Sequence, residues 1–178
     1  MAKVVADSPV KNQLLTALPH KEYKRLLPHL ETVSLSIKEV LHEPYQPIKY
    51  VYFPENGLIT KVVSTEDGSS LEVGLVGKEG MSAIFVFMGS SMSPFKAIVQ
   101  VPGEARRVEA AVFQAEVKRN WAWTDVCFVT RKLSCAWYRN RLPATASIPL
   151  KNDFADGCSC RMIGWDRMNF RSPRNPLP

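Results

Sequence analysis

Short runs with a two-residue hydrophobic period follow one another from residue 31 to residue 108, and they constrain the fold more than any other feature. This period is typical of strands with one buried face. The Asp67-Gly68 step within residues 66–69 favours a tight hairpin turn. We therefore expect antiparallel strands at these apolar positions: Val33, Leu35 and Ile37; Val40 and Leu41; Tyr50 to Phe53; Leu58 to Val63; Leu71, Val73 and Leu75; Ala97 to Val101; and Arg106 to Val108.

Helical spacing precedes and follows these strands. Ser8 and Pro9 form an N-cap and first-turn pair for one short helix, and a second apolar stripe predicts a helix that docks on a sheet. A further helix is expected from Glu109 to Arg119, whereas Gly80 to Gly89 fits either a buried helical turn or a strand. The apolar positions of the first two helices are Leu14, Leu15 and Leu18, then Tyr23, Leu26, Leu27 and Leu30.

Together these elements predict a mainly β fold with flanking α-helices. The expected architecture is an antiparallel, jelly-roll-like β-roll with two N-terminal helices and a short helix after the roll. No apolar run approaches the roughly 18 residues that span a bilayer, and residues 1–13 lack the apolar stretch of a signal peptide. We therefore expect a soluble, cytoplasmic protein with no membrane partner.

The composition changes abruptly near residue 120. Residues 1–120 hold 14 Lys+Arg and 13 Asp+Glu, whereas residues 121–178 hold 9 and 4, with no glutamate. All four tryptophans and all four cysteines also lie beyond residue 120. The basic charge therefore belongs to the C-terminal third, and its last residues, rich in Pro and Arg, are expected to be disordered.

Several separated segments resemble the sensor domain of Crp/Fnr-type bacterial transcription regulators. They are NQLLTALPHKEYKRLLPHL, VLHEPYQPIKYVYFPENGLI, EDGSSLEVGLVGKEGM and KAIVQVPGEARRV, and they cover about residues 11 to 119. The resemblance implies a cyclic-nucleotide-binding-type β-roll that senses a small-molecule effector. In the family, a long dimerisation helix and a DNA-reading winged helix-turn-helix follow this domain.

The resemblance also indicates where an effector would bind. Family members that bind cyclic nucleotides hold the ribose with a Gly-Glu pair, for which Gly77-Lys78-Glu79-Gly80 can stand in. They hold the phosphate with Arg followed by Ser or Thr, and here that pair is replaced by Phe95-Lys96, which has no guanidinium fork. Cyclic AMP is therefore doubtful, and a solvated loop pair is the simpler interpretation of Glu79 and Lys96. The candidate ligand-binding residues are Gly77, Glu79, Gly80 and Met81 for the cap, with Ser93, Lys96 and Ala97 opposite.

Residues 120–178 resemble neither the dimer helix nor the DNA-binding domain. Synonymous codons exist for ATASIPLKNDFADGCSCRMIGWDRMNF such that stepping back one nucleotide reads CNRLHSIEERLCRWLLMPHDWMGSDEF, which is similar to this family's entry into the winged helix-turn-helix. The same offset turns Trp123 to Pro143 into a helix-like stretch. One shift near Asn120 or Trp121 explains the whole segment. The hypothesis is a frameshifted or truncated regulator in which sequence-specific DNA binding is lost and dimerisation is weakened or lost.

This hypothesis divides the chain into an N-terminal arm (1–10), a sensor domain (11–119) and a non-homologous tail (120–178). Without a dimer helix, apolar tail residues such as Trp121, Trp123, Phe128 and Trp137 either pack on the roll face that this helix would cover or stay exposed. A stand-alone ligand-binding or protein-interaction module is the alternative, and it differs in whether the tail folds.

Metal and enzyme chemistry have little support in the sequence. Cys127 and Cys135 are too far apart for a usual zinc pair, and the absence of cysteine before residue 121 excludes an iron-sulfur sensor in that part. His20, His29 and His42 stand in contexts typical of surface histidines, so neither a haem ligand nor a convergent cupin-like metal site is indicated. We expect no catalytic residues, no metal and no cofactor.

Overall fold

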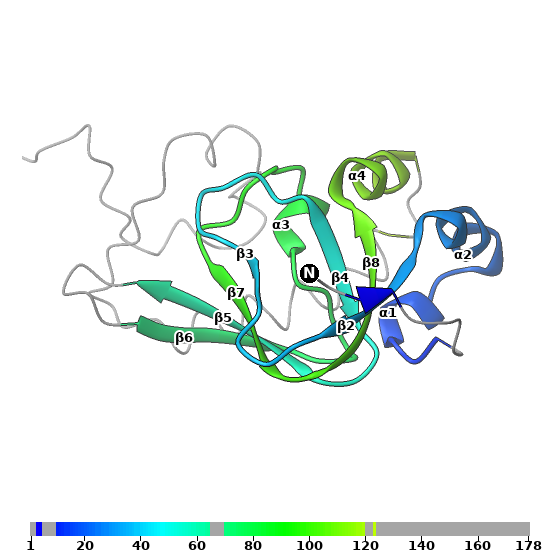
Figure 1. Cartoon of the computed structure of the whole chain (residues 1–178). Coiled ribbons are helices and arrows are strands. Elements are labelled where there is room, and N and C mark those ends of the chain that lie inside the picture. The colour runs from blue at the N-terminus through cyan, green and yellow to red at the C-terminus, as the bar shows by residue number, and fades with distance from the viewer. Residues whose placement is uncertain (1–2, 5–9, 65–69, 120–122, 124–178) are drawn as a thin grey trace, which may run out of the picture.

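The computed structural model describes residues 3–4, 10–64, 70–119 and 123. Two four-stranded antiparallel sheets face each other, with strand orders β1-β2-β8-β4 and β3-β7-β5-β6 (Figure 1). The strands are β1 (Lys3–Val4), β2 (Glu31–Leu35), β3 (Val40–His42), β4 (Tyr50–Pro54), β5 (Leu58–Ser64), β6 (Ser70–Val76), β7 (Lys96–Val101) and β8 (Gly103–Glu109). The predicted mainly β fold, an antiparallel roll with flanking helices, is confirmed.

The helices gather mainly at one end of the roll. Helices α1 (Gln13–Thr16) and α2 (His20–Leu26) precede the strands, a 3-10 turn (Leu27–His29) follows α2, and α4 (Ala110–Arg119) continues directly from β8. Figure 1 shows α1, α2 and α4 near the same end of the roll, whereas α3 (Ile84–Phe87) lies nearer its middle. The undecided Gly80–Gly89 segment is therefore a short helix within a longer connection.

Three local expectations from the sequence were wrong. The N-cap of α1 is Asn12, whose side chain accepts hydrogen bonds from Leu14 N and Leu15 N, and the predicted Ser8-Pro9 cap lies outside the described residues. The second helix ends at Leu26, and Leu27 is exposed because Pro28 tightens the chain into the 3-10 turn.

The third concerns β2, which stops at Leu35 and leaves Ile37 exposed. Lys38 has a φ of 64°, and Glu39 bonds through its backbone N–H to Ser36 O and through its carboxylate to Ser36 N. A closed turn therefore interrupts the alternation that the sequence continues through Ile37.

The predicted hairpin is confirmed by the pairing of β5 with β6, from Ile59 opposite Val76 to Ser64 opposite Ser70. A register shift between Lys61 and Val62 marks a bulge in this pair. The turn residues 66–69 themselves lie outside the described part of the chain. The first strand, β1, was not predicted; it pairs Lys3 with Ser34 and Val4 with Val33.

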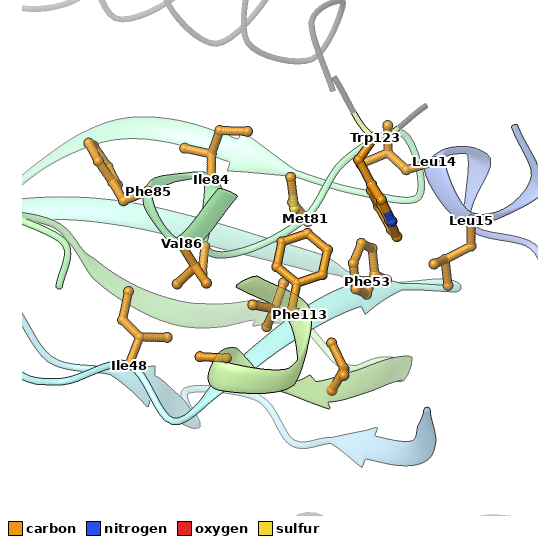
Figure 2. Close-up of a cluster of buried hydrophobic side chains, with 14 of the residues drawn as sticks. Leu14, Leu15, Ile48, Phe53, Met81, Ile84, Phe85, Val86, Phe113 and Trp123 are labelled. Carbon is orange, nitrogen blue, oxygen red and sulfur yellow. The ribbon is translucent and has the colours of Figure 1, made fainter. Parts of the chain in front are cut away.

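The buried apolar side chains of the described residues form two hydrophobic clusters. The larger joins the N-terminal helices to α3, α4 and β4, and the smaller fills the space between the sheets around Val33, Ile59 and Val99. Trp123 lies in the larger cluster with only 1% of its surface exposed. Its ring is 5.0 Å from that of Phe113 and 6.3 Å from that of Phe53, next to Leu14 and Leu15 in Figure 2. The core thus extends past Arg119.

Among the described residues, every helix is too short or too polar to cross a bilayer.

Candidate functional site

The Gly77–Gly80 loop, which carries the predicted cap residues, forms a tight turn after β6. Gly80 N–H donates to Gly77 O at 3.1 Å, and Gly77 N–H donates to the Glu79 carboxylate at 2.8 Å. Both Lys78 and Glu79 are exposed. The carboxylate that would meet a ribose therefore accepts a hydrogen bond from the backbone of its own loop.

This loop is tied to the N-terminal helix. Asn12 Nδ2 donates to Gly80 O at 3.0 Å and to Pro54 O at 2.9 Å, while Gln13 N–H donates to Lys78 O at 2.7 Å. Asn12 is fully buried, and its oxygen caps α1 at the same time. One side chain thus fixes α1, the end of β4 and the candidate cap relative to one another.

Replacing Asn12 with alanine is expected to lower the free energy of unfolding by about 2–3 kcal/mol, because a helix cap and two buried amide hydrogen bonds are lost together. Thr16→Ala, on the exposed side of the same helix, is the control, with an expected change below about 0.5 kcal/mol. Urea unfolding of both variants measures the difference. Equal costs would show that Asn12 does not hold the loop.

Met81 and Ser82 continue the loop into the core rather than toward solvent. Met81 is 1% exposed and belongs to the larger cluster, and Ser82 exchanges hydrogen bonds with the backbone of Tyr52. Met81 therefore supports the cap from beneath.

The residues predicted to lie opposite the cap, Ser93, Lys96 and Ala97, have different surroundings from one another. Ser93 is buried and accepts a hydrogen bond from Phe95 N–H at 3.1 Å, and the ring of Phe95 packs 5.7 Å from that of Phe85. Lys96 is partly exposed and forms a 3.1 Å ion pair with Glu43. The solvated pair expected for Lys96 thus exists, but with Glu43 as the partner. Ala97 is fully buried in the smaller cluster.

Two buried ionisable residues flank Ala97 across the sheet, and the sequence analysis did not single them out as a site. His42 of β3 and Lys61 of β5 are both register partners of Ala97, and Lys61 is also opposite Gly74 of β6. His42 was expected at the surface and is 7% exposed, whereas Lys61 is 3% exposed. The inward register of Ala97 is the reason, because directly paired residues share one face of a sheet.

The electrostatic consequences of this burial are large. Desolvation, followed by the nearby charge of Lys61, lowers the pKa of His42 to about 4, against a smaller opposing effect of Glu43. Desolvation also lowers the pKa of Lys61 to about 8. At neutral pH the imidazole is therefore uncharged while most Lys61 ammonium groups keep their proton.

A second buried charge pair lies on the other sheet. Arg106 Nε is 3.4 Å from Glu55 Oε1, with side chains 3% and 2% exposed. Glu55 Oε2 also accepts hydrogen bonds from the backbone N–H groups of Lys11 and Asn12. The pair therefore fastens the chain just before α1 to strands β4 and β8.

Comparison with known proteins rests on solved structures, since no family profile and no curated protein matches the chain. A mutant regulatory subunit of a cAMP-independent protein kinase A from Trypanosoma brucei, bound to cAMP, gives a TM-score of 0.60 at 15% identity over 75% of this chain and 48% of that one. The sensor domain of the transcriptional regulator DNR from Pseudomonas aeruginosa gives 0.56 at 14% identity over 75% and 89%. The c-di-GMP responsive regulator CLP from Xanthomonas campestris gives 0.57 at 12% identity over 68% and 62%.

The chain has the fold of a cyclic-nucleotide-binding domain. The resemblance to Crp/Fnr-type sensor domains is thus confirmed at the level of the fold. The chain spans about half the length of the trypanosomal regulatory subunit.

Within this cyclic-nucleotide-binding fold, the position expected to carry the phosphate-binding arginine holds Phe95, whose ring is 3% exposed and packs in the core. The next residue, Lys96, has its charge partly neutralised by Glu43. A phosphate at this place would meet neither a guanidinium fork nor an unpaired cation. The doubt about cyclic AMP therefore has a structural basis in these two residues.

The pKa of His42 makes stability sensitive to acid. Because the folded-state pKa of about 4 lies below the ordinary 6.5, the unfolded chain binds a proton between these pH values and the folded chain does not. Stability is expected to rise with pH through this window, and its loss on acidification to amount to about 3 kcal/mol when complete. In His42→Gln, the free energy of unfolding measured with urea should depend less on pH between pH 7 and pH 4 than in the wild type. In the control His29→Gln, at an exposed position, this pH dependence should stay that of the wild type.

Proposed function

We propose that residues 11–119 are the effector-sensing domain of a Crp/Fnr-like bacterial transcription regulator. The fold carries this proposal, because the same fold forms the DNR sensor domain, 89% of which is covered by this chain. The link from the candidate cap through Asn12 to α1 gives an effector at this loop a mechanical route into the helical end of the domain. The proposed role is regulatory and not enzymatic.

We further propose that a reading-frame shift near codon 120 replaced the dimer helix and the winged helix-turn-helix. The support is the change of composition at this point, together with the family-like amino-acid sequence that a one-nucleotide offset restores over residues 144–170. Under this proposal the chain folds as a sensor, and sequence-specific DNA binding is lost because two recognition helices are no longer presented by a dimer.

Resequencing the source gene across codons 115–178 is the first test. The proposal predicts one of two results: a one-base correction near codon 120, or an unchanged gene in which the frame shifted by one nucleotide encodes a complete DNA-binding domain. An unchanged gene in which the shifted frame soon reaches stop codons would contradict the frameshift.

The second test compares the chain with a restored-frame protein. From random duplex DNA at physiological salt, the restored-frame protein is expected to select a two-fold symmetric site and to be dimeric by light scattering. The chain as written is expected to select none, and any binding by its nine basic tail residues should be sequence-independent and fall steeply with salt. Selection of the same site by both proteins would refute the loss of DNA binding.

A further inference from the structure

We propose that the hollow between α1 and α2 binds a small molecule that has a short aliphatic chain and one carboxylate. The described residues that line this hollow all fall between Val10 and Tyr23. The site is therefore separate from the Gly77–Gly80 loop that the family resemblance indicated. It goes beyond the proposed sensor function, because it requires only the packing of the two N-terminal helices.

The hollow has the size of a small-molecule site. Its volume is about 440 Å³, and pockets that bind small molecules in proteins measure roughly 300–1,000 Å³. Its walls come from α1, the turn after it and α2, which Figure 1 shows next to each other at one end of the roll. The described lining residues are Val10, Leu15, Thr16, Leu18, His20 and Tyr23.

The floor of the hollow is aliphatic. Leu15 and Leu18 are 1% and 6% exposed and belong to the larger hydrophobic cluster, and Val10 packs against this cluster. Leu15 lies beside Trp123 in Figure 2, so the floor continues into the core. Methylene groups placed on these side chains leave water for an apolar surface, which is favourable in proportion to the area that they bury.

The rim of the hollow carries positive charge. His20 is exposed and offers an imidazole N–H donor, and Lys24 lies four residues further along α2, on the same side of the helix. Among the described residues, no carboxylate pairs with Lys24, whereas Arg25 next to it pairs with Glu22 at 3.5 Å. A carboxylate at the rim therefore meets a donor and a cation without a counter-charge.

The walls are held in place without a ligand. Asn12 caps α1 and also donates to Pro54 O and Gly80 O, so the helix is fixed to the roll from its outer side. Pro19, with a φ of −54°, begins α2 three residues after α1 ends. Binding of a small molecule therefore does not have to order the site, and this favours its affinity.

Methyl NMR spectra of the full chain, titrated with sodium hexanoate, test the proposal. Hexanoate is expected to shift the methyl signals of Leu15 and Leu18 and not those of Leu35, which lies in the smaller cluster. Sodium acetate keeps only the head group and should bind at least about tenfold more weakly, because it lacks the chain. Equal affinities for acetate and hexanoate, or no shift of Leu15 and Leu18, would overturn the proposal, whether another segment of this chain or a second copy then fills the hollow.

Lys24→Gln tests the recognition of the carboxylate. The variant is expected to bind hexanoate about two- to fivefold more weakly, the effect of one exposed ion pair, and to bind the uncharged 1-hexanol as the wild type does. Lys21→Gln is the matched control, at an exposed position of the same helix outside the lining, and should leave both affinities unchanged. An equal effect of Lys24→Gln on hexanoate and hexanol, or no effect on hexanoate, would overturn the carboxylate class.

Thr16→Trp tests the position of the site. Thr16 is exposed at the end of α1, so the indole can occupy the hollow without entering the core, and hexanoate binding should weaken at least about tenfold. Ala17→Trp introduces the same ring at the next residue, which is exposed and outside the lining, and should keep the affinity of the wild type. Equal affinities of the two variants would place the ligand elsewhere and overturn the site.

Discussion

Trp123→Ala is expected to lower the free energy of unfolding by about 3–5 kcal/mol, the range for deleting a large buried aromatic side chain. The indole is 1% exposed and meets Phe113 edge-to-face, at 5.0 Å and 87°. Its removal leaves a hole between α1, β4 and α4 in the cluster that Figure 2 shows. Urea unfolding followed by circular dichroism measures the loss.

Trp165→Ala is the matched control for this prediction. Under the proposed frameshift, residue 165 belongs to a segment that was never selected to fold with the roll, and its replacement should leave the free energy of unfolding unchanged. Chains ending at residue 119 and at residue 124 extend the test. The shorter one is expected to be about as unstable as Trp123→Ala, and the longer one as stable as the full chain. Equal stability of the two would show that the core is complete at Arg119.

Glu55→Ala is expected to lower the free energy of unfolding by a further large amount, about 3–5 kcal/mol, because it removes a buried carboxylate that pairs with the guanidinium of Arg106. The backbone N–H groups of Lys11 and Asn12 lose their acceptor in the same variant. The entry to α1 should therefore loosen together with the roll. Hydrogen exchange at Asn12 and Gln13 reports on the first effect and urea unfolding on the second.

The control for Glu55→Ala is Glu31→Ala. Glu31 also pairs with an arginine, Arg107, at 2.8 Å, but its side chain is 51% exposed. Solvent screens such a pair, so the expected cost is below about 1 kcal/mol. Similar costs for the two variants would mean that burial does not strengthen the Glu55 interaction.

Much of the fold was predictable because its determinants are local. The alternation of Val33 and Leu35, the Asp-Gly turn between two such runs and the helical spacing after Glu109 each depend on neighbours along the chain. They correspond to β2, the β5-β6 hairpin and α4. The class of the fold follows from their order.

The features that local patterns missed depend on contacts between distant residues. Asn12 caps α1 because its amide also meets Pro54 and Gly80, which no spacing rule connects to it. His42 was expected at the surface and Lys61 received no prediction of its own, and their burial follows from strand pairing with Ala97. The burial of His42 and Lys61 was therefore not visible in the sequence, whereas the Gly77–Gly80 loop was found through its resemblance to a family.

The position of Trp123 bears on how this protein is made. Its indole closes a cluster that already contains Leu14 and Leu15, so the core cannot be completed until codon 123 has been translated and the residue has left the ribosome. Under the proposed frameshift, the nascent chain at this point contains all the described strands of the roll. Its last residues, however, are already translated from the shifted frame. The indole that completes the core is then encoded by a codon in the shifted frame. Folding of the sensor domain therefore depends on a tryptophan that was not selected for this position.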